Sequence, residues 1–185
     1  MRNLFLLGLA IVTASPAQAQ EAELAGFSGA LRGCEEWVLN PASWIDGPAP
    51  FESAVGLGDK MGLVAEIDQA SLPPPALRQA NHYWRINSTA TTGYVLVVSD
   101  QLPMCHISGG GDADLQPVVE TVLATSDFSS RWEQTSVEEH QGLRSTMFRS
   151  RVDPLFSATV TRAKNPGARK DRVQVLVTAT YELEN

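Results

Sequence analysis

Met104-Cys105-His106 is the part of the sequence whose side chains are best suited to chemistry. A thioether, a thiol and an imidazole are soft ligands that copper and zinc prefer. The segment predicts a short strand, in which neighbouring side chains point to opposite faces. Cys105 therefore cannot join Met104 and His106 around one ion, and those two would need His82 or His140 to complete a site. We expect no metal centre and no cofactor, and the candidate metal ligands are Met104, His106 and His82.

Patterns for nucleophilic or phosphate chemistry are missing from the sequence. It holds no G-x-S-x-G elbow for an activated serine. Gly109-Gly110-Gly111 is predicted to be a loop that leads into a helix, a place where backbone N–H groups can hold an anion. However, Asp112 and Asp114 occupy that place, and the Lys and Ser/Thr of a P-loop are absent. These patterns favour a non-catalytic binding or accessory module over an enzyme.

Two other functions stay open. The first is an enzyme or metal-binding protein that uses His106 with His82 or His140. It requires these imidazoles to converge on each other, or on a carboxylate, in a pocket. The second is a secreted inhibitor or immunity-like interaction protein, which would use a surface patch and no cleft.

The two cysteines, Cys34 and Cys105, predict one disulfide. Cys34 lies on the apolar stripe of a predicted helix, in register with Leu31 and Val38, and Cys105 shares a strand face with Ile107. In an oxidising compartment two lone cysteines of this kind pair with each other. We therefore expect the bond to tie the first helix to the sheet.

The first 19 residues have the plan of a signal peptide. Arg2 provides a positive start, residues 4–12 form an apolar run, and Ala17-Gln18-Ala19 supplies a small-x-small cleavage site. We predict cleavage after Ala19, which leaves residues 20–185 as a single domain in the periplasm or secreted. No later segment approaches the run of about 20 apolar residues that spans a bilayer, so an integral membrane protein is not expected.

Charge is unevenly distributed along the chain. Asp and Glu number 21 against 14 Lys and Arg, which disfavours a nucleic-acid partner. Residues 20–126 hold four cations against 13 anions, so the first part of the mature chain is strongly acidic.

One turn near the C-terminus is basic. This turn, residues 162–172, is a candidate contact with an unknown protein or a phosphate-bearing envelope component. Cations at a hairpin tip also prevent an exposed sheet end from pairing with other chains, and we favour this interpretation of them. The basic residues are Arg162, Lys164, Arg169, Lys170 and Arg172.

The pattern of apolar residues predicts an α+β fold, a mainly antiparallel sheet with helices packed on one face. One helix is predicted over 21–39, where Asn40-Pro41 ends it, and another over 115–123, capped by Asp114. The three glycines of the first helix either weaken it or let it lie close to a sheet. Prolines 73–75 predict a connector that crosses the surface, and no internal repeat is visible. Strands are predicted at 61–67, 82–86, 93–99, 103–107, 143–150, 155–163 and 173–183, and a short helix at 51–57. Residues 126–142 are ambiguous, with Phe128 and Trp132 one helical turn apart in a polar context.

Overall fold

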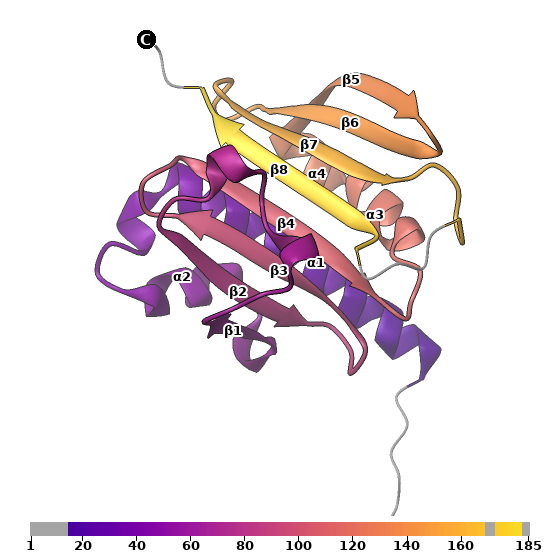
Figure 1. Ribbon diagram of the computed structural model, residues 1–185, viewed down its shortest axis with the longest axis horizontal. Helices are drawn as coiled ribbons and strands as arrows, with labels where there is room; N and C mark the ends of the chain where they lie inside the picture. Colours follow the sequence, from indigo (N-terminus) through magenta and orange to yellow (C-terminus); the bar gives the residue numbers. More distant parts are fainter. Residues whose placement is uncertain (1–14, 169–172, 183–185) are drawn as a thin grey trace, which may run out of the picture.

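An eight-stranded antiparallel sheet forms the centre of the protein (Figure 1). The computed structural model describes residues 15–168 and 173–182. Along the sheet the strand order is β1-β2-β3-β4-β8-β7-β6-β5. The strands are β1 (Met61–Val64), β2 (Asn81–Asn87), β3 (Thr92–Ser99), β4 (Met104–Gly111), β5 (Trp132–His140), β6 (Leu143–Ser150), β7 (Phe156–Ala163) and β8 (Val175–Tyr181).

The sheet is built from two four-stranded meanders that meet at their last strands. Strands β1 to β4 pair in sequence order, as do β5 to β8, and β4 pairs with β8 at the centre. Ile107 lies opposite Val177 at this seam. One or more helices precede each meander, so the topology repeats although the sequence shows no repeat.

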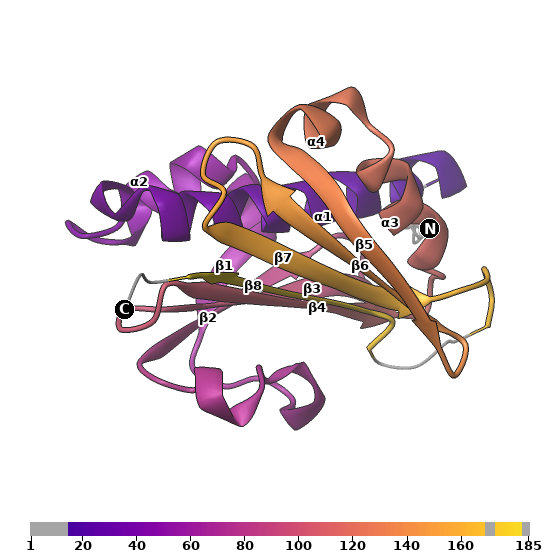
Figure 2. The same ribbon diagram turned by 90° about the horizontal axis from the view of Figure 1, so that it is seen from above.

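All four α-helices cover one face of the sheet (Figure 2). Phe27, Leu31 and Cys34 of the first helix are buried against the inner face of the sheet, where Leu96 and Cys105 are fully buried. The α+β class is thereby confirmed. The helices are α1 (Pro16–Leu39), α2 (Pro48–Val55), α3 (Gln116–Leu123) and α4 (Ser126–Arg131).

The glycines of α1 let the helix approach the sheet and α2 closely. A Cβ atom on Gly29 would lie 2.6 Å from Leu57, and one on Gly33 would lie 2.8 Å from Leu96. Real Cβ atoms do not come this near to other heavy atoms, so larger residues would push the helix outward. Close packing, the second of the two roles predicted for these glycines, is the one that the structure shows.

Helix α1 starts earlier than predicted. It begins at Pro16, where the side chains of Ser15 and Gln18 form a capping box. The residues of the predicted cleavage site, Ala17 to Ala19, lie in its first turns. The apolar run of the predicted leader lies outside the described residues. No helix in the described part of the chain is long and apolar enough to cross a bilayer.

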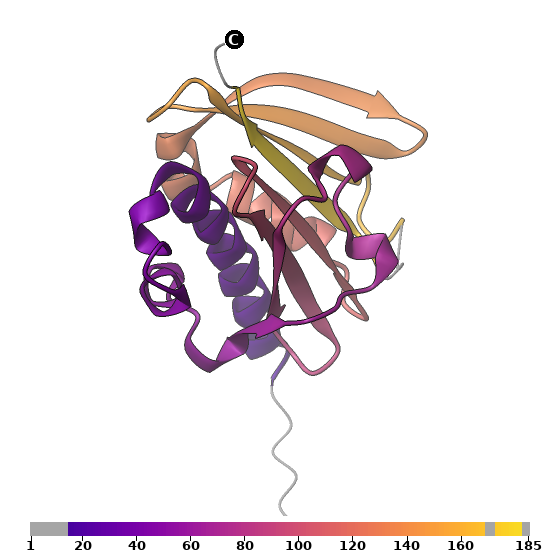
Figure 3. The same cartoon turned by 60° about the vertical axis from the view of Figure 1, so that its left-hand side comes forward.

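Residues 65–80, which we call the strap, run over the face of the sheet that carries no α-helix (Figures 2 and 3). Two short 3-10 helices, Gln69–Ser71 and Pro75–Leu77, interrupt it. Prolines break both helix and ladder hydrogen bonding, which keeps this segment as a covering loop. The predicted surface crossing is therefore present, and it covers part of the sheet.

Two local predictions differ from the structure, and a segment that the sequence left ambiguous is resolved. Gly109 to Gly111 belong to β4 rather than to a loop. The N-cap of α3 is Leu115, although a carboxylate oxygen of Asp114 still accepts the N–H of Gln116 at 3.1 Å. The ambiguous segment 126–142 divides into α4, capped by Thr125, and the edge strand β5, which follows without a loop.

Candidate functional site

A pocket rich in indole rings opens between the end of α1, the start of α2 and the first two strands. Its volume is about 310 Å³, and its lining is mostly apolar. We call it the indole pocket. The lining residues are Trp37, Trp44, Ile45, Gly47, Pro48, Leu63, His82, Trp84 and Asp100.

Trp37 and Trp44 form one rigid wall of the indole pocket. Their rings stack in parallel with centroids 4.4 Å apart. The indole N–H of Trp37 donates to the carbonyl of Ser99 at 2.9 Å, and that of Trp44 donates to the carbonyl of Trp37 at 2.9 Å. Helix α1 ends at Leu39, before Pro41, and this break lets the chain turn back so that Trp44 reaches Trp37.

Trp84 of β2 contributes a buried wall. Only 1% of this residue is exposed, and its ring packs on Phe51 of α2 with centroids 5.3 Å apart. Its indole N–H is buried and has no hydrogen-bond acceptor in the described part of the chain. Buried tryptophan N–H groups usually find a partner, so this one is an exception that lies at the pocket.

A polar pair marks the rim of the pocket. His82 Nε2 lies 2.7 Å from Asp100 Oδ2, and both side chains are partly exposed. The imidazole ring also lies 5.6 Å from the Trp37 ring, between centroids. The mouth of the pocket therefore has an acidic group on one side and aromatic faces on the other.

Two large apolar side chains lie at the same pocket and face solvent. Ile45 is 72% exposed and Leu63 is 54% exposed.

Comparison with protein-family models, with curated proteins and with solved structures finds no match for this chain. Its function is therefore inferred from geometry. Most residues that line the indole pocket are apolar or aromatic, an arrangement that suits the binding of an apolar molecule.

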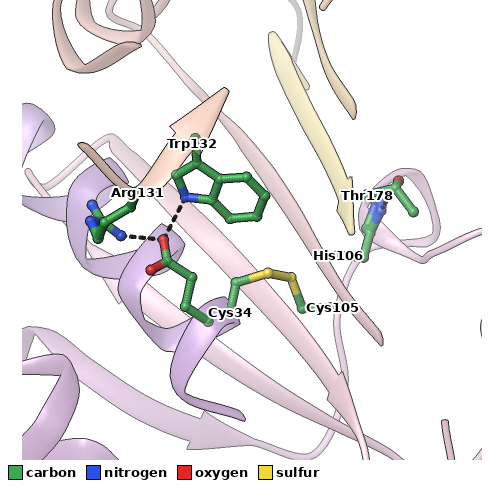
Figure 4. Close-up of a disulfide and its surroundings, with 7 residues drawn as sticks. Cys34, Cys105, His106, Arg131, Trp132 and Thr178 are labelled. Atoms are coloured by element: carbon green, nitrogen blue, oxygen red, sulfur yellow. Dashed lines mark hydrogen bonds and ion pairs between the residues drawn. A yellow bond between two sulfur atoms is a disulfide. The ribbon is translucent and has the colours of Figure 1, made fainter. Parts of the chain in front are cut away.

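The predicted disulfide is confirmed. Cys34 of α1 and Cys105 of β4 are bonded, with Cα atoms 5.4 Å apart, and both are buried in the core (Figure 4). The bond ties the first helix to the sheet, as the stripe and strand patterns predicted.

The candidate metal ligands do not come together. Met104 and His106 are buried on the strap face of the sheet, opposite to the face of Cys105, as strand alternation predicted. His82 lies on the helix face beside Trp37, and His140 ends β5 at the far edge of the sheet. Among the described residues, no three His, Cys, Asp or Glu side chains are grouped to hold a metal ion. His106 therefore meets neither His82 nor His140, whereas His82 does lie beside a carboxylate in a pocket, that of Asp100, as this alternative required of an imidazole.

His106 instead makes one internal contact. Its Nδ1 lies 2.9 Å from the hydroxyl of Thr178 on β8, on the far side of the disulfide from Trp132 (Figure 4). Only 3% of the residue is exposed, and burial lowers the pKa of the imidazole to about 4. The side chain is therefore neutral at ordinary pH.

The sequence did not indicate a second polar cluster, which joins α1 to the other meander. Glu35 accepts hydrogen bonds from the indole N–H of Trp132 at 2.7 Å and from the guanidinium of Arg131 (Figure 4). Arg131 also donates to Asp127, one turn before it in α4. This cluster holds α4 and the start of β5 against the helix that carries Cys34, which is a structural role.

The basic turn is less available than predicted. Arg162 is a correction: it is 4% exposed, and its guanidinium binds Glu120 at 2.9 Å and the hydroxyl of Thr146 at 2.7 Å. Lys164 is exposed and pairs with Glu139 at 2.6 Å. Arg169, Lys170 and Arg172 lie outside the described residues. Of the predicted contact surface, the structure therefore places only Lys164 at the surface.

Proposed function

We propose that the chain is an exported, non-catalytic binding protein that takes a small apolar molecule into the indole pocket. The observation that carries this proposal is the position of Ile45 and Leu63. Each exposes more than half of its surface at the mouth of a pocket walled by indole rings. Contiguous apolar surface of this kind marks a binding site in a soluble domain.

The size of the pocket limits the ligand. At about 310 Å³ it stands at the lower end of the range typical of ligand pockets, roughly 300–1,000 Å³. It suits a molecule of one or two rings, which can stack on or meet the edge of the indoles. Trp37, Trp44 and Phe51 hold one another in place, so the aromatic wall is formed before the ligand arrives.

The charge near the pocket selects among apolar molecules. Asp100 lines the mouth, and residues 20–126 carry an excess of acidic groups. A neutral or cationic substituent is favoured there, because an anionic one would meet Asp100 in a partly desolvated setting. Aromatic faces add further attraction for a cation.

Dye titration tests the site. The neutral dye N-phenyl-1-naphthylamine should gain fluorescence on binding, and Ile45→Ser should raise its Kd by roughly tenfold, since an apolar contact of that size is worth about 1.5 kcal/mol. Val152→Ser is the matched control, because Val152 is 78% exposed away from the pocket. Equal affinity in the two variants would contradict the proposal.

A competition experiment tests the charge preference with two competitors that share a phenol ring and carry opposite charges. Tyramine should displace the dye at lower concentration than 3-(4-hydroxyphenyl)propanoate does. Asp100→Asn should reduce that difference, because it removes the carboxylate at the mouth. Stronger displacement by the anion would show that the ligand class is wrong even if the dye binds.

Export is the second part of the proposal. The positive start, the apolar run and the small-x-small site support it, and the Cys34–Cys105 bond agrees with an oxidising compartment. The periplasm is the compartment that we propose, with secretion beyond it as the alternative.

A further inference from the structure

A second hollow lies on the opposite face of the sheet from the indole pocket. Gly93 of β3 lies directly opposite Gly110 of β4, and Asn87 of β2 completes the row. These residues alternate with inward-facing ones such as Tyr94, so the row lies on the strap face of the sheet, where neither glycine carries a side chain. The resulting cavity has a volume of about 250 Å³. We call it the glycine hollow.

Two serine hydroxyls from distant parts of the chain line the glycine hollow. Ser108 lies on β4 and is 2% exposed, and its hydroxyl has no hydrogen-bond partner among the described residues. Ser71 lies in the strap and is 9% exposed, and no bond to its hydroxyl is found within residues 15–168 and 173–182. A buried hydroxyl without a partner is unfavourable by about 1–3 kcal/mol unless another molecule satisfies it. The hydroxyl of Ser108 therefore marks a place for a polar ligand atom, and Ser71 lines the same hollow.

Arg85 supplies a positive charge at the same hollow. It is exposed on β2, opposite Val95, which in turn lies opposite Ser108. In the described part of the chain Arg85 makes no ion pair, whereas Arg32 and Arg78 donate to the carbonyls of Val55 and Pro73. No Asp or Glu is among the described residues that line the hollow, although this half of the chain is acidic.

We propose that the glycine hollow binds a small hydroxycarboxylate. The guanidinium of Arg85 presents the forked pair of N–H groups that a carboxylate accepts. One arginine balances one negative charge, so a singly charged carboxylate fits better than a dianionic phosphate. The hydroxyl of Ser108 then bonds the ligand's own hydroxyl. This site is separate from the indole pocket, and either can fail without the other.

NMR titration of the ¹⁵N-labelled full chain tests the site. Acetate, glycolate and lactate are added at constant pH and ionic strength. Saturable shifts are expected at the backbone amides of Arg85, Gly93 and Ser108. Glycolate and lactate should bind roughly threefold or more tightly than acetate, because each offers one further hydrogen bond. Arg85→Gln should weaken all three by about tenfold or more, whereas Ser108→Ala should make glycolate equal to acetate.

The control is Arg149→Gln. Arg149 is also an exposed arginine, but it lies on β6, away from the hollow, so its loss should leave binding unchanged. Absence of saturable shifts with all three carboxylates would overturn the proposal. So would equal losses in Arg85→Gln and Arg149→Gln, or tighter binding of inorganic phosphate than of any carboxylate.

Discussion

His106 shows how much a single buried side chain can contribute to the pH dependence of stability. The imidazole is buried on the strap face of the sheet and is neutral there. One ring nitrogen is bonded to Thr178, and the other has no partner among the described residues. Because burial lowers its pKa from 6.5 to about 4, the unfolded chain binds a proton more readily than the folded protein does. Acid therefore favours unfolding at this residue.

We expect the free energy of unfolding to fall as the pH is lowered from about 6.5 to about 4, and this residue to contribute no further change below pH 4. The loss from His106 alone is roughly 3 kcal/mol. His106→Gln, which keeps a hydrogen-bonding group near Thr178, should remove this part of the dependence. Urea unfolding of both proteins at several pH values measures it. Parallel stability curves for the two proteins would contradict the prediction.

At the residue scale, local patterns predicted the features that depend on a single helix or strand, such as the face on which a side chain lies. The alternation around Met104 to His106 placed Cys105 on one face and its neighbours on the other, as the structure shows. The indole pocket was not predicted, because Trp37, Trp44 and Trp84 come from three segments that only tertiary packing brings together. The same holds for Glu35 and Trp132, which are 97 positions apart.

At the scale of elements, the main connection is the bond between α1 and β4. It closes a loop of 71 positions in the unfolded chain, which by chain entropy is worth roughly 4 kcal/mol. The helix also packs through Gly29 and Gly33, so close packing and the covalent bond act on the same face.

Cys34→Ala and Cys105→Ala should each lower the free energy of unfolding by roughly 4 kcal/mol, or less if the reduced chain stays compact. The double variant should be no less stable than either single one, because all three lose the same bond. Urea unfolding of the oxidised, reduced and variant proteins measures the effect. Losses that simply add would contradict a shared bond.

Element boundaries were predictable where sequence signals were local. Asn40-Pro41 ended α1 as expected, and strand β6 has the predicted bounds. The run Gly109 to Gly111 predicts a loop, because glycine is rare in strands. They extend β4 instead, since the ring of Tyr94 and the side chain of Val175 cover Gly109 and leave no room for a Cβ atom. Such a reason lies in tertiary contacts and has no signature in a short window.

At the scale of the whole molecule, the predicted cleavage site overlaps the first turns of α1, so cleavage would shorten a folded element. Cleavage after Ala19 would remove Ser15 and Gln18, which form the capping box. The buried positions of α1 begin at Glu23, so the packed part of the helix would remain. The mature domain would thus keep its core and lose only a surface cap.

We predict that the exported protein begins at Gln20. N-terminal sequencing of protein purified from the periplasm checks this directly. Replacement of Ala17 and Ala19 by Leu should block cleavage, because the processing site requires small residues. Recovery of the wild-type chain from the cytoplasm with Met1 intact would contradict export.

The seam between β4 and β8 also determines the order in which the sheet can assemble. Each meander forms from strands that are neighbours in the chain, whereas His106 and Thr178 at the seam are 72 positions apart. Contacts of such separation form late and slow the folding rate. Because the chain is synthesised from the N-terminus onward, β4 remains an unpaired edge of the first meander until β8 has been synthesised. That edge holds buried residues of the finished core, so during synthesis it is open to pairing with another chain.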